Sequence, residues 1–179
     1  MKYLTDQEIR KLNDIAYEIR KLSVEMIACG QWGHIGGSFS LAEILAVLYF
    51  KTLHIDPSQP KMDNRDYFVL SKAHCSPALY AALALRGFFP IEKLYSYCRL
   101  GGLEGHLDAL ETPGLEASGG SLGMGLSYSV GIAYGLKLKE QFAPRVFCII
   151  GDGELSEGQI WEAAMSASHY RLDNLIAII

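Results

Sequence analysis

Apolar residues recur at helical spacing along the first part of the chain. Thr5-Asp6-Gln7-Glu8 has the pattern of a capping box, and Gly30 follows the last periodic position. The apolar positions between them share one helical face: Ile9, Leu12, Ile15, Ala16, Ile19, Leu22, Met26 and Ile27. This pattern predicts a long amphipathic helix that ends at Gly30.

Two more stretches predict helices with their own start signals. Ser40-Leu41-Ala42-Glu43 is a second capping box, which we expect to open a helix that runs to about Leu53. In the next helix Ser76 is the expected cap, Pro77 occupies the first position and Gly87 is the stop.

A helical pattern also runs from about Ser121 to Gln141, although glycines interrupt it. Each glycine inside a helix costs about 1 kcal/mol relative to alanine, so something must compensate for it. We attribute Gly131 and Gly135 to close packing of this helix against a sheet. Gly120, Leu122 and Gly123 lie at the start of the helix, where they are better placed to meet a ligand.

Continuous apolar runs predict strands. Val146–Ile150 is typical of a strand buried on both faces, Tyr67–Leu70 is a shorter candidate, and Leu175–Ile179 follows a helix at Gln159–Tyr170. Strand, helix and strand in this order predict a parallel pair with a right-handed crossover. The fold class is therefore α/β, with a doubly wound parallel sheet and helices on both faces. The connection 100–119 has little periodicity, and long loops of this kind are often functional.

An acid held between two glycines, Asp152, follows the strand 146–150 directly. In open parallel sheets ligands bind where strands end, and an acid there would repel a phosphate group unless a cation lay between them. Mg²⁺ or Ca²⁺ prefers such oxygen ligands, and Gly151 and Gly153 let the backbone approach a phosphate. The alternative is a helix cap, because Ser156 and Gln159 have capping-box spacing. We favour metal binding as the role of Asp152 and a structural role for Glu157.

Composition narrows the classes of protein. The 179 residues are 50% apolar, enough for one core, and we expect a single partial domain over 1–179. A net charge of −4 without a basic block argues against nucleic acid. The four cysteines show no C-x-x-C spacing, and neither a signal peptide nor a membrane span is evident, so we expect a soluble cytoplasmic protein with reduced thiols.

Five segments together resemble the N-terminal, diphosphate-binding domain of transketolases, which use thiamine diphosphate to move two-carbon ketol units between sugars. The segments are Gly33-His34-Ile35-Gly36-Gly37-Ser38, Leu70-Ser71-Lys72-Ala73-His74, Gly105-His106-Leu107-Asp108, the run from Glu116 to Gly125, and the run from Gly151 to Gly158. Ile35, Ala73, Met124 and the Leu107-Asp108 pair depart from residues common in the family, which leaves the accepted sugars open.

The resemblance implies roles for particular residues. His34, His74 and His106 match histidines that line the substrate channel or lie against the cofactor, where an imidazole can donate to hydroxyls and move protons near pH 7. Gly120 and Leu122 match positions that contact the pyrimidine ring. Gly151, Asp152 and Gly153 match the diphosphate loop, with Asp152 on Mg²⁺ or Ca²⁺. Surface or turn positions are the alternative for the histidines, and helix packing for Gly120 and Leu122.

The resemblance also implies a partner. The family completes its site with a pyrimidine-binding domain, and its second metal ligand, an Asn, would fall beyond Ile179, so we expect the isolated chain to be inactive. Because a buried strand seldom ends a chain with its edge left to solvent, we also expect the sheet to be incomplete at the C-terminus. The expected assembly is a homo- or hetero-oligomer with a C-terminal transketolase subunit, acting on sugar phosphates. A non-catalytic truncated subunit that only binds a partner is the alternative. Deoxyxylulose-phosphate synthases and 2-oxoacid dehydrogenases are disfavoured by the first two motifs.

Overall fold

The computed structural model describes residues 4–179, which divide into two compact units. The first unit takes the chain up to Leu53 and adds His74–Gly105. The second unit joins His54–Ala73 to His106–Ile179.

The first unit is helical. Its helices are α1 (Asp6–Gly30), α2 (Ile35–Phe39), α3 (Ala42–Val47) and α4 (Ser76–Arg86), with a π-helical segment η1 (Leu48–Thr52) and a 3₁₀ segment η3 (Ile91–Ser96). The predicted capping box is confirmed, because Glu8 N donates to Thr5 Oγ1 at 3.3 Å and Thr5 N donates to Glu8 Oε2 at 2.9 Å. α1 packs against α3, α4 and η3, and its side chains Ile19 and Met26 are fully buried.

The second predicted capping box is wrong. Ser40 Oγ donates to the Gly37 carbonyl at 2.9 Å instead of capping a helix, and Leu41 is the residue that precedes α3. Glu43 pairs with Arg20 across the unit at 2.6 Å. The ion pair and the serine hydrogen bond thus use the side chains that the capping box would need. The predicted helix 40–53 is observed as α3 followed directly by the π-helical segment η1.

The third start signal is partly right. Pro77 lies in the first turn of α4, and Gly87 ends the helix with a left-handed φ of 97°. Ser76 is itself the first helical residue, after Cys75, and its Oγ donates to the Gly105 carbonyl at 2.6 Å. Its hydroxyl joins two segments of the unit and does not cap the helix.

One helical stretch, Ile35–Thr52, has the length and hydropathy of a candidate membrane span. It is made of α2, α3 and η1, and Leu41, Leu45 and Ala46 along it are buried at 0–1% exposure. Of the whole stretch 39% is buried, and a single stretch of this kind is weak evidence for a membrane span.

The second unit contains a three-stranded parallel sheet in the order β1-β2-β3. The strands are β1 (Tyr67–Leu70), β2 (Val146–Ile149) and β3 (Leu175–Ile178), as the apolar runs predict. Every residue of β2 is buried, so both of its faces lie away from solvent.

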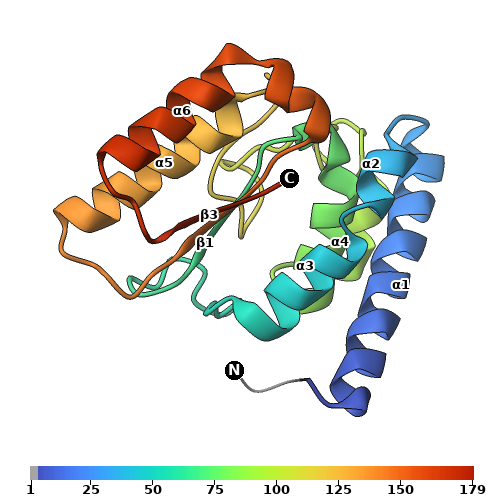
Figure 1. Ribbon diagram of the computed structural model, residues 1–179. Helices are drawn as coiled ribbons and strands as arrows, with labels where there is room; N and C mark the ends of the chain where they lie inside the picture. Colours follow the sequence, from blue (N-terminus) through green and yellow to red (C-terminus); the bar gives the residue numbers. More distant parts are fainter. Residues whose placement is uncertain (1–3) are drawn as a thin grey trace. The chain divides into compact units, whose positions relative to one another are not determined.

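Helices α5 (Met124–Leu138) and α6 (Gly158–His169) lie side by side over one face of this sheet (Figure 1). Leu126 of α5, Cys148 of β2 and Ile160 of α6 form their shared core. The prediction that Gly131 and Gly135 pack closely against the sheet is wrong, because a Cβ at either position would meet no atom within 4 Å. On α5 the sheet contacts come from Leu126, Ala133 and neighbouring side chains instead.

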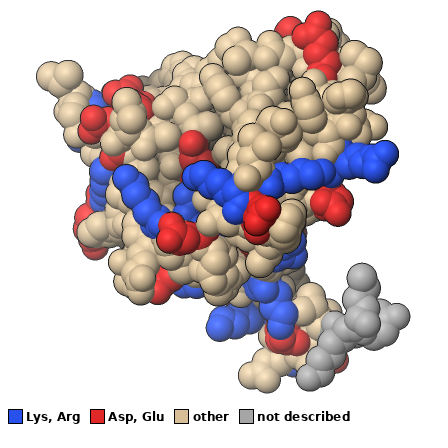
Figure 2. All heavy atoms as spheres, turned by 90° about the vertical axis from the view of Figure 1, so that its left-hand side faces the viewer, with Lys and Arg blue, Asp and Glu red and all other residues tan. Residues whose placement is uncertain are grey.

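Charges of both signs are interspersed on the surface. Figure 2 shows Lys and Arg beside Asp and Glu on the face that it draws. Some surface charges pair, including Arg20 with Glu43 at 2.6 Å. This mixture agrees with the absence of a basic block in the sequence.

Candidate functional site

Two loops of the second unit meet at the carboxyl edge of its sheet. β1 ends at Leu70 and passes into Ser71, and β2 ends at Ile149 and passes into Gly151. Because the strands are parallel and in register, these loops leave the sheet at the same edge, where α/β proteins bind ligands.

Asp152 begins a short 3₁₀ segment, η4 (Asp152–Ser156), directly after β2. Its side chain is exposed and makes no hydrogen bond or ion pair with the residues that the structure describes. Gly153 is also exposed, and a Cβ there would meet no protein atom within 4 Å. The loop thus presents an unpaired carboxylate beside an open backbone position.

The helix-cap alternative for this loop is wrong in its details. α6 begins after Glu157, which has extended backbone angles and precedes the helix, so Ser156 is not the cap. Gln159 Nε2 donates to Ser127 Oγ at 2.9 Å and thereby ties α6 to α5. The role of Glu157 is structural in one respect, since a Cβ at Gly123 would lie 2.9 Å from Glu157 Cβ.

Glu154 is the residue of this region that the sequence did not reveal. Its side chain is 2% exposed and accepts hydrogen bonds from Ser71 Oγ at 2.7 Å, Gly123 N at 2.8 Å and Gly151 N at 2.7 Å. Ser71 Oγ in turn accepts from Gly125 N at 3.2 Å. One carboxylate therefore joins the ends of β1 and β2 to the start of α5.

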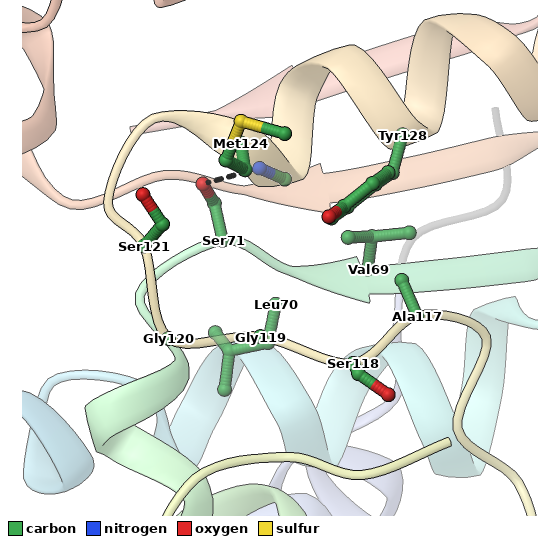
Figure 3. A pocket seen from close by; sticks show the side chains of 11 residues that line it. Val69, Leu70, Ser71, Ala117, Ser118, Gly119, Gly120, Ser121, Met124 and Tyr128 are labelled. Carbon is green, nitrogen blue, oxygen red and sulfur yellow. Dashed lines mark hydrogen bonds between the residues drawn. The ribbon is translucent and has the colours of Figure 1, made fainter. Parts of the chain in front are cut away.

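A cavity of about 240 Å³ opens beside this network (Figure 3). Its walls come from the end of β1, the loop before α5 and the first turns of α5; they are Val69, Leu70, Ser71, Ala117, Ser118, Gly119, Gly120, Ser121, Met124, Gly125 and Tyr128. Gly120 lies at the cavity wall. Leu122 does not line the cavity and is 43% exposed.

Two glycines here are required by their surroundings. Gly123 precedes α5 with a φ of 84°, a left-handed conformation that favours glycine. A Cβ at Gly125 would lie 2.4 Å from the Cα of Ser71, so α5 starts in direct contact with the end of β1. These contacts position the loop that carries Gly120.

The predicted histidines fall into two groups. In the first unit, the rings of His34 and His74 lie 5.0 Å apart, and the Trp32 ring lies 5.5 Å from that of His34. In the second unit, His106 approaches Gly120, with its Cδ2 4.0 Å from the place of an added Cβ. The structure brings His34 to His74, and His106 to the cavity loop.

The donor set suits a metal held jointly with phosphate oxygens. Among residues 4–179, no group of three His, Cys, Asp or Glu side chains could hold a metal by itself. Mg²⁺ bound with a diphosphate needs only one or two carboxylates, because phosphate and water oxygens complete its shell. Asp152 and the open Gly153 fit that arrangement. Lys72 also borders the loop, with its Cδ 3.4 Å from the place of a Cβ on Gly151.

An α/β unit with a parallel sheet belongs to the class of proteins that bind ligands at the carboxyl edge of the sheet, where Asp152 lies. The family model described as "Transketolase, thiamine diphosphate binding domain" matches residues 11–179. The chain therefore belongs to the transketolase family, and this region is its thiamine diphosphate-binding domain.

Two relatives similar to this chain are named as transketolase subunits. The chain is 49% identical over 175 residues to the 6-deoxy-6-sulfo-D-fructose transketolase subunit SqwG of Clostridium sp. (strain MSTE9), covering 97% of this chain and 63% of the relative. It is 43% identical over 161 residues to one of the apulose-4-phosphate transketolase subunits of Phocaeicola vulgatus, covering 89% and 57%. The chain thus spans about six-tenths of these relatives.

Solved structures confirm the predicted fold class. Transketolase from Leishmania mexicana superposes with a TM-score of 0.88 at 30% identity, over 93% of this chain and 26% of that one. Transketolase from Campylobacter jejuni gives 0.87 at 32% identity, over 97% and 28%. The α/β fold with a parallel sheet and helices is that of the transketolase domain.

Proposed function

We propose that this chain provides the diphosphate-binding part of a transketolase-type transferase. The reaction moves a two-carbon ketol unit from one sugar to another, and it depends on thiamine diphosphate and a divalent cation, Mg²⁺ or Ca²⁺. The observation that carries the proposal is the unpaired Asp152 carboxylate beside the open Gly153, at the edge of the sheet in a thiamine diphosphate-binding family.

In this proposal Asp152 ligates the cation, and the exposed backbone at Gly153 faces the diphosphate. Gly151, which the sequence also predicted to contact the cofactor, is buried and donates its N–H to Glu154, so it supports the loop from behind. When bound, thiamine diphosphate supplies the electron sink needed to cleave a carbon–carbon bond, which no side chain provides. Gly120 and Leu122 are proposed to lie against the pyrimidine ring. Because Leu122 is 43% exposed, it has apolar surface available for such a contact.

His34, His74 and His106 are the proposed sugar-facing groups. The short ring separation of His34 and His74 lets them act on neighbouring hydroxyls of one substrate. A neutral imidazole can donate to a hydroxyl at one nitrogen and accept a proton at the other.

The proposed substrates are sugars with an anionic end group. The relatives' names include a sulfonated sugar and a sugar phosphate. Both relatives are named as subunits, which supports a partner for this chain that carries the pyrimidine-binding domain.

Calorimetric titration of the full-length protein, assembled with its complementary subunit, tests this function. Thiamine diphosphate should bind in the presence of Mg²⁺ and lose most of its affinity when a chelator is added. Asp152→Asn should weaken Mg²⁺-dependent binding at least ten-fold, because the metal loses a charged protein ligand.

Asp173→Asn is the matched control. Asp173 is an exposed acid that precedes β3, at the other end of the same sheet, so its loss changes the net charge equally. Unchanged affinity in Asp152→Asn, or equal weakening in both variants, would remove Asp152 from the site. Cofactor binding that stays tight without any divalent cation would refute the proposed metal requirement.

A further inference from the structure

Glu154 is the deeply buried carboxylate of the loop that follows β2. At 2% exposure it forms no ion pair with the residues that the structure describes, and its oxygens accept only from one hydroxyl and two backbone N–H groups. A buried carboxylate without an ion pair needs well-placed hydrogen bonds to compensate for its lost hydration.

The hydrogen bonds of Glu154 connect three segments that carry the proposed cofactor site. Oε1 accepts from Ser71 Oγ, after β1, and from Gly123 N, before α5. Oε2 accepts from Gly151 N, in the diphosphate loop itself. Ser71 at the cavity wall and Gly151 in the loop that carries Asp152 thus donate hydrogen bonds to the same carboxylate.

The same geometry fixes which way the loop faces. η4 is a 3₁₀ segment with about three residues per turn, so Gly151 and Glu154 lie on one side of it. Both are buried, while Asp152 and Gly153 between them are exposed. Turning Glu154 inward therefore turns the Asp152 carboxylate outward, toward the place of the diphosphate.

We propose that Glu154 is a positioning residue, which orients Asp152 and Gly153 for a metal diphosphate by anchoring their loop to Ser71 and Gly123. The inference rests on the proposed function, since it assigns Glu154 a part in the same site. Glu154 itself touches neither the cofactor nor the metal in this account.

Cation preference distinguishes positioning from mere structural support. Mg²⁺ requires nearly ideal octahedral geometry, whereas Ca²⁺ tolerates irregular coordination. A loop that no longer fixes Asp152 should therefore lose Mg²⁺-supported binding more than Ca²⁺-supported binding. General loss of stability would weaken both alike.

The experiment measures the Kd of thiamine diphosphate with saturating Mg²⁺ or Ca²⁺, on the full-length protein with its complementary subunit. In Glu154→Gln the side-chain NH₂ group is a donor that faces a backbone N–H donor. The Kd with Mg²⁺ should therefore rise at least ten-fold, and this rise should be at least three times larger than the rise with Ca²⁺. Asp66→Asn is the matched control, because Asp66 is another buried acid, 3% exposed. It accepts hydrogen bonds from the backbone N–H groups of His54 and Arg145, at the opposite end of the strands β1 and β2. Asp66→Asn should lower the melting temperature but change both Kd values by less than two-fold.

Ser71→Ala keeps the inference testable where Glu154→Gln does not fold. It removes one donor to Glu154 and the acceptor of Gly125 N, and should shift the Mg²⁺/Ca²⁺ ratio of Kd in the same direction. An unchanged ratio in the folded variants, or an equal shift in Asp66→Asn, overturns the positioning role. Absence of cation-dependent binding in the unmodified protein would instead refute the proposed function.

Discussion

The Ala73 methyl group occupies the space beside the cavity that a side chain on Gly119 would need. A Cβ added to Gly119 would lie 2.5 Å from Ala73 Cβ, and its next neighbours, Ala73 Cα and Leu70 O, are at ordinary distances of 3.8 and 3.9 Å. The methyl group of Ala73 is thus the sole obstacle among the described residues. Gly119→Ala forces a shift of about 1 Å, and overpacking of this kind costs about 1–3 kcal/mol.

Ala73→Gly should remove that obstacle. Alone it loses a methyl group that is 1% exposed and adds backbone freedom, which together cost about 1–2 kcal/mol. In the double variant Ala73→Gly/Gly119→Ala the new methyl group takes the vacated space. The double variant should therefore be more stable than the sum of the single changes by about 1–3 kcal/mol.

Urea denaturation of the two single variants and the double variant measures this coupling. Far-ultraviolet circular dichroism before denaturation shows whether each variant is folded. Additive losses in the double variant, or a Gly119→Ala variant within about 0.5 kcal/mol of the unmodified protein, would refute the packing that the structure shows.

Two further predictions concern stability. Gly131→Ala should raise the free energy of unfolding by about 0.5–1 kcal/mol, because the glycine is in a helix and a Cβ there meets nothing; destabilisation in the assembled protein would show that a partner packs on this face of α5. Burial opposes ionisation of Asp66, but hydrogen bonds from the Arg145 side chain and from the backbone N–H groups of His54 and Arg145 outweigh it and lower its pKa. Its stabilisation is therefore present above the unfolded pKa of about 3.9 and is lost as pH falls through the lower folded value. Melting temperatures below pH 4 should fall less steeply in Asp66→Asn, and parallel pH profiles would contradict this.

Local signals predicted the elements that position the site. The apolar run of β2 and the acid after it are neighbours in sequence, so strand and loop were both evident. The first capping box likewise depends on residues three apart.

Distant partners explain what the sequence did not show. Glu154 is fixed by groups 83 and 31 residues away, and within its own segment it resembles an ordinary acid of a first helical turn. Ser40 and Glu43 had the right spacing for a cap, but Arg20 on α1 takes the glutamate. Gly131 and Gly135 suggested close packing against the sheet. The sequence could not show that they lie on a face of α5 that does not meet the sheet.

The central claim is that Asp152 meets the diphosphate through a metal ion. Crystals of the full-length protein with its complementary subunit, grown with thiamine diphosphate and Mn²⁺, would test it by anomalous diffraction at the manganese edge. We expect one anomalous peak within about 2.0–2.3 Å of an Asp152 carboxylate oxygen and of the diphosphate. Bound cofactor with Asp152 paired to a basic side chain, and no anomalous peak beside it, would contradict the claim.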